Sequence, residues 1–139
     1  MLPTPYRQLL TIGLLTGLLA GCEATGDSGG SRTVSAAEVP FSFRLPSEFT
    51  EETVDDANSR GDVLVAAGVT KVDVVAVRRV SGPLPAGEQR HRVLGQDVVS
   101  ELHAVEGHPG FALECQYTGD RADKVRAACR DALRTVRRK

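Results

Sequence analysis

The stretch FALECQYTGDRADKVRAACRDALRTV, residues 111–136, changes its hydrophobic period half-way along. Over residues 111–117 apolar and polar side chains alternate, as in a half-buried strand. One face of that strand would carry Phe111, Leu113, Cys115 and Tyr117. Over residues 120–137 the apolar residues recur at helical spacing and form one stripe. We therefore predict a strand and then an amphipathic helix, with Asp120 as its N-cap and Asp123 in its first turn.

Cys115 and Cys129 both lie on the apolar side of these two elements. Packing the helix stripe against the strand face would bring the thiols together, so we predict a structural disulfide between them. Two free core thiols, or a redox or metal pair, are the alternatives. The separation is not that of a Cys-x-x-Cys redox motif, and no histidine cluster completes a zinc site. A bridge that closes a loop of about 15 residues would stabilise the domain by roughly 3 kcal/mol.

Four further strands are predicted upstream. Residues 41–46 alternate and end in proline, residues 63–67 and 72–80 form a Val-rich hairpin, and residues 98–105 alternate again. Pro109 and Gly110 suit a type II turn that starts at His108. The acidic residues 47–58 are expected to be a short exposed helix or an irregular loop, and residues 81–92 a long Pro- and Gly-rich loop. The fold class is α+β, an antiparallel sheet packed against the C-terminal helix.

The N-terminal residues carry a different signal. Arg7 precedes an apolar run over residues 9–19, which ends in Leu19-Ala20-Gly21-Cys22. The run of about 11 residues is too short for a permanent membrane span, which needs about 20. The arrangement resembles the signal peptide and lipobox of bacterial lipoproteins. This resemblance implies cleavage before Cys22, a diacylglyceryl group on its thiol and a place on the extracytoplasmic face of the cell membrane. The alternatives are an ordinary signal peptide with a chance cysteine, or a short tail anchor.

The resemblance divides the chain into three parts. They are a signal peptide over residues 1–21, the lipidated cysteine with a flexible tether over residues 22–38, and an extracytoplasmic domain over residues 39–139. The tether is rich in Gly and Ser and has too few apolar side chains to offset the entropy of ordering. The whole chain has a formal net charge of −1, and loss of Arg7 makes it about −2, so no overall field favours nucleic acid.

Half of the positive charge that follows residue 21 lies after residue 119. Arg126, Arg130 and Arg134 recur every four residues on the predicted helix, and Arg137 and Arg138 extend the charge. A solvated helix face explains this pattern, since cations complement the C-terminal end of the helix dipole. The alternative is a surface that binds anionic lipid headgroups, wall polymers or an acidic partner.

The domain also has a recognisable order of motifs. A Phe-x-Phe-x-Leu-Pro strand opens it, the Val-rich hairpin follows, and then comes the turn Gly107-His108-Pro109-Gly110 and a helix that ends in Leu-Arg-Thr-Val. Over about residues 39–137 this order resembles the small extracellular lipoproteins with a PsbP/Mog1-like α+β fold. The resemblance implies a curved antiparallel sheet flanked by helices, used for binding and assembly. It implies no shared catalytic residues, so no site residue is carried over.

Catalytic motifs are few. Glu101 and His103 share a strand face and could hold a metal or act as a general base, although side chains in such a position ordinarily point to water. His108 is expected to be a solvated turn residue. There is no Gly-x-Ser-x-Gly elbow, Walker A loop or dinucleotide fingerprint. We expect a non-enzymatic accessory or partner-binding lipoprotein without a cofactor or metal. The alternative is a small-ligand carrier or sensor with a pocket near residues 81–92.

Overall fold

The computed structural model describes residues 30–54 and 62–139. Residues 31–139 form one compact unit. The predicted signal peptide, Cys22, the start of the tether and residues 55–58 of the acidic segment lie outside the described residues.

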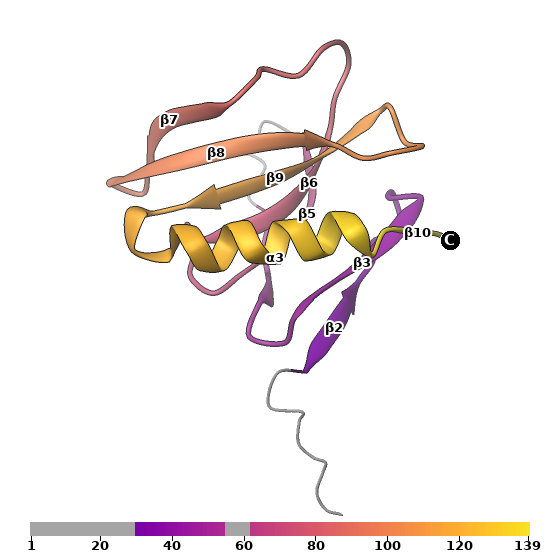
Figure 1. Cartoon of the computed structure of the whole chain (residues 1–139), viewed down its shortest axis with the longest axis horizontal. Coiled ribbons are helices and arrows are strands. Elements are labelled where there is room, and N and C mark those ends of the chain that lie inside the picture. The colour runs from indigo at the N-terminus through magenta and orange to yellow at the C-terminus, as the bar shows by residue number, and fades with distance from the viewer. Residues whose placement is uncertain (1–29, 55–61) are drawn as a thin grey trace, which may run out of the picture. The chain divides into compact units, whose positions relative to one another are not determined.

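A six-stranded antiparallel sheet forms the centre of this unit (Figure 1). Its strands are adjacent in the order β4-β5-β6-β9-β8-β7. Their bounds are Thr50–Glu52 (β4), Val63–Gly68 (β5), Val74–Arg79 (β6), Phe111–Tyr117 (β9), Gln96–Ala104 (β8) and Glu88–Val93 (β7). The sheet and its C-terminal helix confirm the predicted α+β class, and β5 pairs with β6 as the predicted hairpin.

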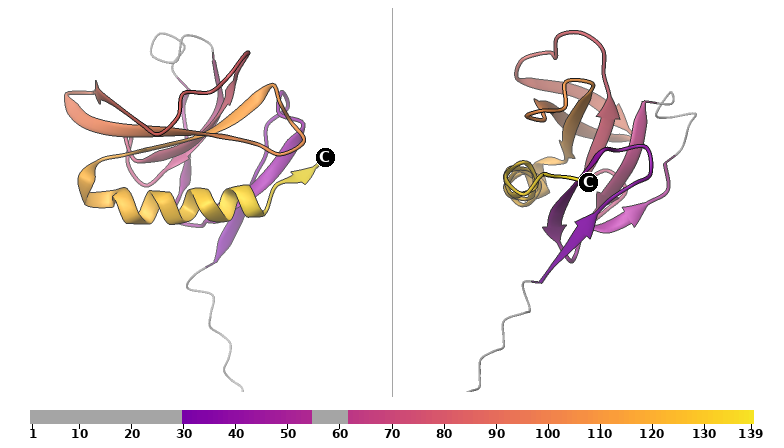
Figure 2. Two further views of the ribbon diagram at one scale, coloured as in Figure 1. Left: turned by 45° about the horizontal axis from the view of Figure 1, so that its top comes forward. Right: turned by 90° about the vertical axis from the view of Figure 1, so that its right-hand side faces the viewer.

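The helix α3, Ala122–Arg134, lies along one face of this sheet. It packs on β9 and on β3, Phe41–Pro46. β3 is the middle strand of a second, three-stranded sheet, between β2, Ser31–Val34, and β10, Arg137–Arg138. This small sheet lies beside the C-terminal end of α3 (Figure 2). The helix therefore bridges the two sheets.

The hydrophobic core lies between α3, β3 and the face of the large sheet that carries Leu113 and Cys115, here called the inner face. Phe41, Phe43 and Leu45 alternate along β3 and are each at most 1% exposed. The rings of Phe41 and Phe111 pack edge to face, with centroids 5.8 Å apart. Burial of these large apolar side chains is the main stabilising term of such a core. It holds α3 over β9.

The helix is shorter than predicted at both ends. Gly119–Arg121 form a 3-10 turn, the N-cap position is Arg121, and no side chain caps it. The prediction that Asp120 caps the helix is therefore wrong, whereas Asp123 does lie in the first turn. At the other end, Thr135 Oγ1 donates to the carbonyl of Asp131 and accepts from the backbone N–H of Arg44. These bonds end the helix and lead the chain into β10.

Two predicted irregular segments contain strands. Residues 31–34, expected in the tether, form β2, because Val34 is only 4% exposed and belongs to the core. Residues 88–93, expected in a long loop, form β7, because their backbone pairs along β8. In the described part of the acidic segment, residues 47–54, Thr50–Glu52 form the short edge strand β4, where a short helix or an irregular loop was expected.

The predicted turn at His108 differs in type. His108 and Phe111 close it by a backbone hydrogen bond, but Gly110 does not have a positive φ. The positive φ, 82°, belongs to Gly107 in the preceding turn, where the N–H of His108 donates to the carbonyl of Val105. The third place of a type II turn requires such a φ, and the turn that meets this requirement is 105–108, three residues earlier in the chain than predicted.

Candidate functional site

The predicted disulfide is present. Cys115 of β9 and Cys129 of α3 are bonded, with Cα atoms 6.2 Å apart, and both residues are at most 2% exposed. The bridge fixes the middle of the helix to the inner face of the sheet. Every side chain that lies between α3 and β8 is positioned relative to it.

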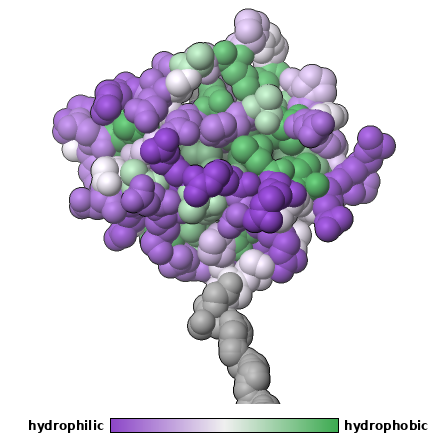
Figure 3. All heavy atoms as spheres, viewed as in Figure 1, coloured by the Kyte–Doolittle hydropathy of each residue, from purple (hydrophilic) through white to green (hydrophobic). Residues whose placement is uncertain are grey.

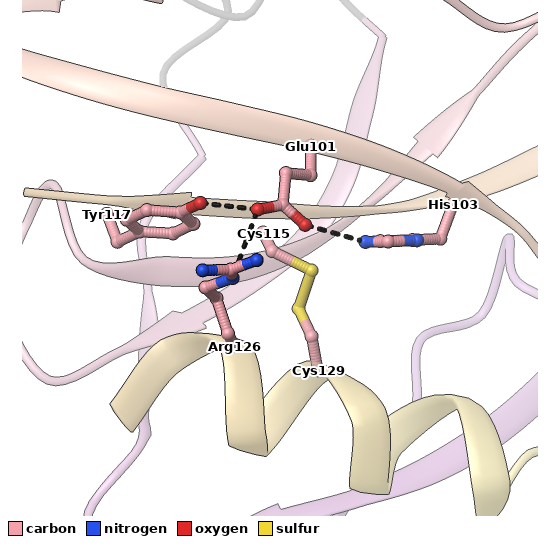
Figure 4. The surroundings of a disulfide bond; sticks show 6 residues. All are labelled: Glu101, His103, Cys115, Tyr117, Arg126 and Cys129. Atoms are coloured by element: carbon pink, nitrogen blue, oxygen red, sulfur yellow. Dashed lines mark hydrogen bonds and ion pairs between the residues drawn. A yellow bond between two sulfur atoms is a disulfide. The ribbon is translucent and has the colours of Figure 1, made fainter. Parts of the chain in front are cut away.

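A polar network lies beside the disulfide (Figure 4). Its centre is Glu101 of β8, which is opposite Cys115 in the β8–β9 register. The carboxylate accepts a hydrogen bond from the Tyr117 hydroxyl, and it contacts Arg126 Nε at 3.3 Å and His103 Nε2 at 3.2 Å. The Glu101 side chain is only 15% exposed, so the expectation that it points to water is wrong.

This network is better suited to holding elements together than to reaction chemistry. Burial, and then the hydrogen bond to Glu101, raises the pKa of Tyr117 to about 12. The phenol therefore stays protonated at neutral pH and remains a donor. Both oxygens of Glu101 already have partners, one facing Tyr117 and Arg126 and the other His103. The carboxylate thus links β8, β9 and α3.

The predicted basic residues separate into two groups. Arg126 is paired with Glu101, and Arg134 is paired with Asp131 on the same helix. Arg130, Arg137 and Arg138 are exposed and form no ion pair among the described residues. Hydrophilic side chains cross the face of the molecule on which α3 lies (Figure 3). Arg137 and Arg138 are on β10, so Arg137 is not the last residue of the helix as predicted.

His108 is not a simple solvated turn residue. Its ring packs on Phe41, with centroids 4.7 Å apart. It therefore closes the edge of the core near the turn between β8 and β9.

A pocket of about 400 Å³ lies on the other side of the sheet, here called the outer face. Residues 80–85, which follow β6 in the chain, border one side of the pocket. The strands β7, β8 and β9 border the other side with Gln89, His91, Ser100, Leu102 and Glu114. Strand alternation places Glu114 opposite to the disulfide-bonded Cys115. This volume is at the small end of the range for small-molecule sites.

Two polar pairs lie in this pocket. Arg78 Nε donates to Glu114 Oε1 at 2.8 Å, and the two side chains are 22% and 9% exposed. His91 Nε2 lies 2.7 Å from Ser100 Oγ, and Ser100 is 3% exposed. These side chains form the wall of the pocket on the sheet side, here called the floor. The segment 80–85, which includes Leu84, forms the opposite wall, here called the roof.

The alternative of a pocket near residues 81–92 named none of the residues that line the pocket seen here. Glu114 alternates with Leu113 and Cys115, so the sequence places it on the opposite strand face but does not show that this face is covered. Its burial depends on the segment 80–85 folding back over the outer face, which no local pattern encodes. The sequence of β7 does contain a signal for the pocket, because Gln89 and His91 alternate with charged residues and thus share one strand face.

Among residues 30–54 and 62–139, no group of three or more His, Cys, Asp or Glu side chains is arranged to hold a metal ion. In the same two ranges, no helix has the length and apolar character needed to cross a membrane. The chain matches no family model, and comparison with curated proteins and with solved structures finds no similar protein. Its function is therefore inferred from its own residues.

Proposed function

We propose that this chain is a cell-envelope lipoprotein, anchored through Cys22 on the extracytoplasmic face of the membrane, whose α+β domain is a non-enzymatic accessory or partner-binding module. The observation that carries the proposal is Leu19-Ala20-Gly21-Cys22 at the end of a short apolar run. The Cys115–Cys129 disulfide supports it, since structural disulfides persist mainly outside the cytoplasm. The likeness of its motif order to the PsbP/Mog1-like lipoproteins agrees with a binding role.

Metabolic labelling with a clickable palmitate analogue tests the anchor. The wild-type chain should take up the label and sediment with membranes, and Cys22→Ala should abolish the labelling. Because the chain has three cysteines, the double variant Cys115→Ala/Cys129→Ala is the matched control and should remain labelled. Incorporation of the label into Cys22→Ala would refute the lipid anchor at Cys22, whereas sedimentation of the variant alone would not, because its apolar run over residues 9–19 stays uncleaved. Crosslinking of the lipidated protein in its own envelope then tests for a protein partner.

A second candidate function, a small-ligand carrier or sensor, is favoured by the pocket beneath residues 80–85. It combines the little-exposed polar groups of Ser100 and Glu114 with the apolar side chains of Leu84 and Leu102, and polar groups of this kind fix the orientation of a ligand in small-molecule sites. Native mass spectrometry of the protein purified from its own envelope tests this function. A carrier should retain a small molecule that is released on unfolding, and repeated recovery of the empty chain would count against it.

A further inference from the structure

We propose that the pocket beneath residues 80–85 binds a small organic ammonium ion, with Glu114 as its carboxylate partner. This inference rests on the second candidate function and names the chemical class of its ligand. It depends on the bonding of Glu114, on the charges around it and on the shape of the pocket.

One carboxylate oxygen of Glu114 lacks a protein donor in the described part of the chain. Its side chain is 9% exposed, and Oε1 accepts from Arg78 Nε. Oε2 has no hydrogen-bond donor among residues 30–54 and 62–139. A buried carboxylate oxygen without a donor is costly, so such atoms ordinarily face a ligand or water. Because Glu114 lines the pocket, a donor bound there can reach this oxygen.

The local charge favours a cation over an anion. Glu114 and Asp62 contribute two negative charges to the pocket wall, and Arg78 contributes one positive charge. Arg78 lies 3.6 Å from Asp62 and is thus shared between the two carboxylates. Arg79 also borders the pocket, but strand alternation directs its side chain to the inner face. A ligand ammonium would neutralise the remaining charge, whereas a ligand carboxylate would be repelled by Glu114.

The rest of the pocket accommodates the body of such a ligand. Pro83 and Leu84 of the roof and Leu102 of the floor offer apolar contacts. The His91–Ser100 pair lies on the same floor and can bond a hydroxyl group. The volume of about 400 Å³ limits the ligand to a small molecule. A compact aliphatic or hydroxylated amine meets all three conditions.

Three probes that share a carbon skeleton test the proposal: cyclohexylmethylamine, cyclohexylmethanol and cyclohexanecarboxylate. Each is titrated into the mature chain, residues 22–139 with Cys22→Ala, and followed by backbone amide NMR. The amine should cause saturable shifts at the amides of residues 80–82, Leu84, Ser100 and Glu114; Pro83 and Pro85 have no backbone N–H. The alcohol should bind at least about tenfold more weakly, since it lacks the charge-assisted hydrogen bond, and the carboxylate should cause no saturable shift.

Glu114→Gln should weaken amine binding by about tenfold or more and leave the alcohol unaffected. Glu88→Gln is the matched control, because Glu88 is exposed on β7 and does not line the pocket. If Glu114→Gln fails to fold, the comparison of the three probes on the otherwise unmutated chain still decides the question. Equal or tighter binding of the alcohol or the carboxylate would overturn the ammonium assignment while leaving a ligand pocket. Absence of shifts with the amine would also overturn it, and the envelope-purified protein then tests the carrier function separately.

Discussion

A hydrogen bond between the side chains of Tyr117 and Glu101 joins the neighbouring strands β9 and β8. The hydroxyl of Tyr117 donates to Glu101, and the same carboxylate contacts Arg126. The folded state stabilises the protonated phenol, since its pKa is about 12 instead of about 10. Tyr117 therefore contributes stability at neutral pH that is lost as the pH rises from 10 to 12.

The ionisation of Tyr117 can be measured directly. Residues 22–139 contain one tyrosine and no tryptophan, so tyrosinate absorbance near 295 nm reports Tyr117 alone. We expect a midpoint near pH 12. Tyr117→Phe should lower the free energy of unfolding by about 1.5 kcal/mol at pH 7, since it removes a hydrogen bond to a charged group. Between pH 10 and 12 this deficit should disappear, because the raised pKa makes the wild-type chain lose about 2 kcal/mol of stability over that range. A midpoint near pH 10 would contradict the buried hydrogen bond.

Arg126 and Arg130 lie on the same exposed side of α3 but differ in their partners. Arg126 is paired with the largely buried Glu101, whereas Arg130 has no ion pair among the residues that the structure describes. Arg126→Gln should cost about 0.5 to 1 kcal/mol, because its side chain is 48% exposed and solvent screens the pair. Arg130→Gln is the control and should be close to neutral. Urea denaturation measures both, and equal effects would argue against a stabilising role for the pair.

The residue pairings differ in how far the sequence predicts them. Cys115 and Cys129 could be paired because each lies on the apolar side of an element whose period is clear. The sequence places Glu101 on a strand face. Its ion pair with Arg126 depends on how α3 lies relative to β8, which the sequence does not show. Glu114 and Arg78 depend on a loop that folds back over the sheet. Contacts that are set by the relative placement of elements are not encoded in local periodicity.

At the scale of elements, the disulfide is the only covalent cross-link between α3 and the large sheet in the described residues, besides the backbone that leads from β9 into the helix. The bonded cysteines are 14 positions apart. Reduction, or the double variant Cys115→Ala/Cys129→Ala, should lower the free energy of unfolding by about 3 kcal/mol. Chemical denaturation with and without reductant measures this. The Cys22→Ala variant is the control, and its stability should not differ from wild type under oxidising conditions; an unchanged midpoint after reduction would contradict the prediction.

A second link joins the β5–β6 turn to the start of the helical segment. Asp73 is 2% exposed and accepts hydrogen bonds from the Thr118 backbone N–H at 2.7 Å and from the Thr70 hydroxyl at 2.6 Å. Asp73→Ala would leave these donors unsatisfied and should cost about 2 to 3 kcal/mol in thermal or urea unfolding. Asp120→Ala is the control, because Asp120 makes no capping bond, and should change stability by less than about 0.5 kcal/mol.

The elements also differ in how well their sequences define them. β9 and β3 alternate cleanly and were predicted with correct bounds. β7 reads EQRHRV, without apolar alternation, and is a strand because its backbone pairs with β8. The helix ends at Arg134 because Thr135 bonds to both α3 and β3. Such ends are decided by tertiary hydrogen bonds that helix propensity does not contain.

At the scale of the whole molecule, the two ends of the domain share the small sheet. Ser31 of β2 pairs with Pro46, and Arg138 of β10 pairs with Phe41, five residues away along β3. These positions are therefore about 20 Å apart. Because the domain begins at β2, only eight residue steps separate Cys22 from residue 30, and they can span at most about 28 Å. If Cys22 is lipidated as proposed, this span limits the distance of Ser31 from the membrane surface, and the basic C-terminus lies about 20 Å from Ser31.

We predict which arginines contact anionic lipid headgroups if the chain is anchored in this way. Arg130, Arg137 and Arg138 are the predicted basic residues without an acidic partner in the described chain. Each cation at an anionic surface contributes about 1 kcal/mol, so replacing all three with Gln should weaken binding to phosphatidylserine-containing vesicles by about a hundredfold. The unlipidated chain, residues 22–139 with Cys22→Ala, is used so that the anchor does not mask the effect. Arg79→Gln/Arg90→Gln/Arg92→Gln loses the same charge elsewhere and is the matched control. Equal losses in the two triple variants would mean that net charge, and not the C-terminal surface, governs membrane attraction.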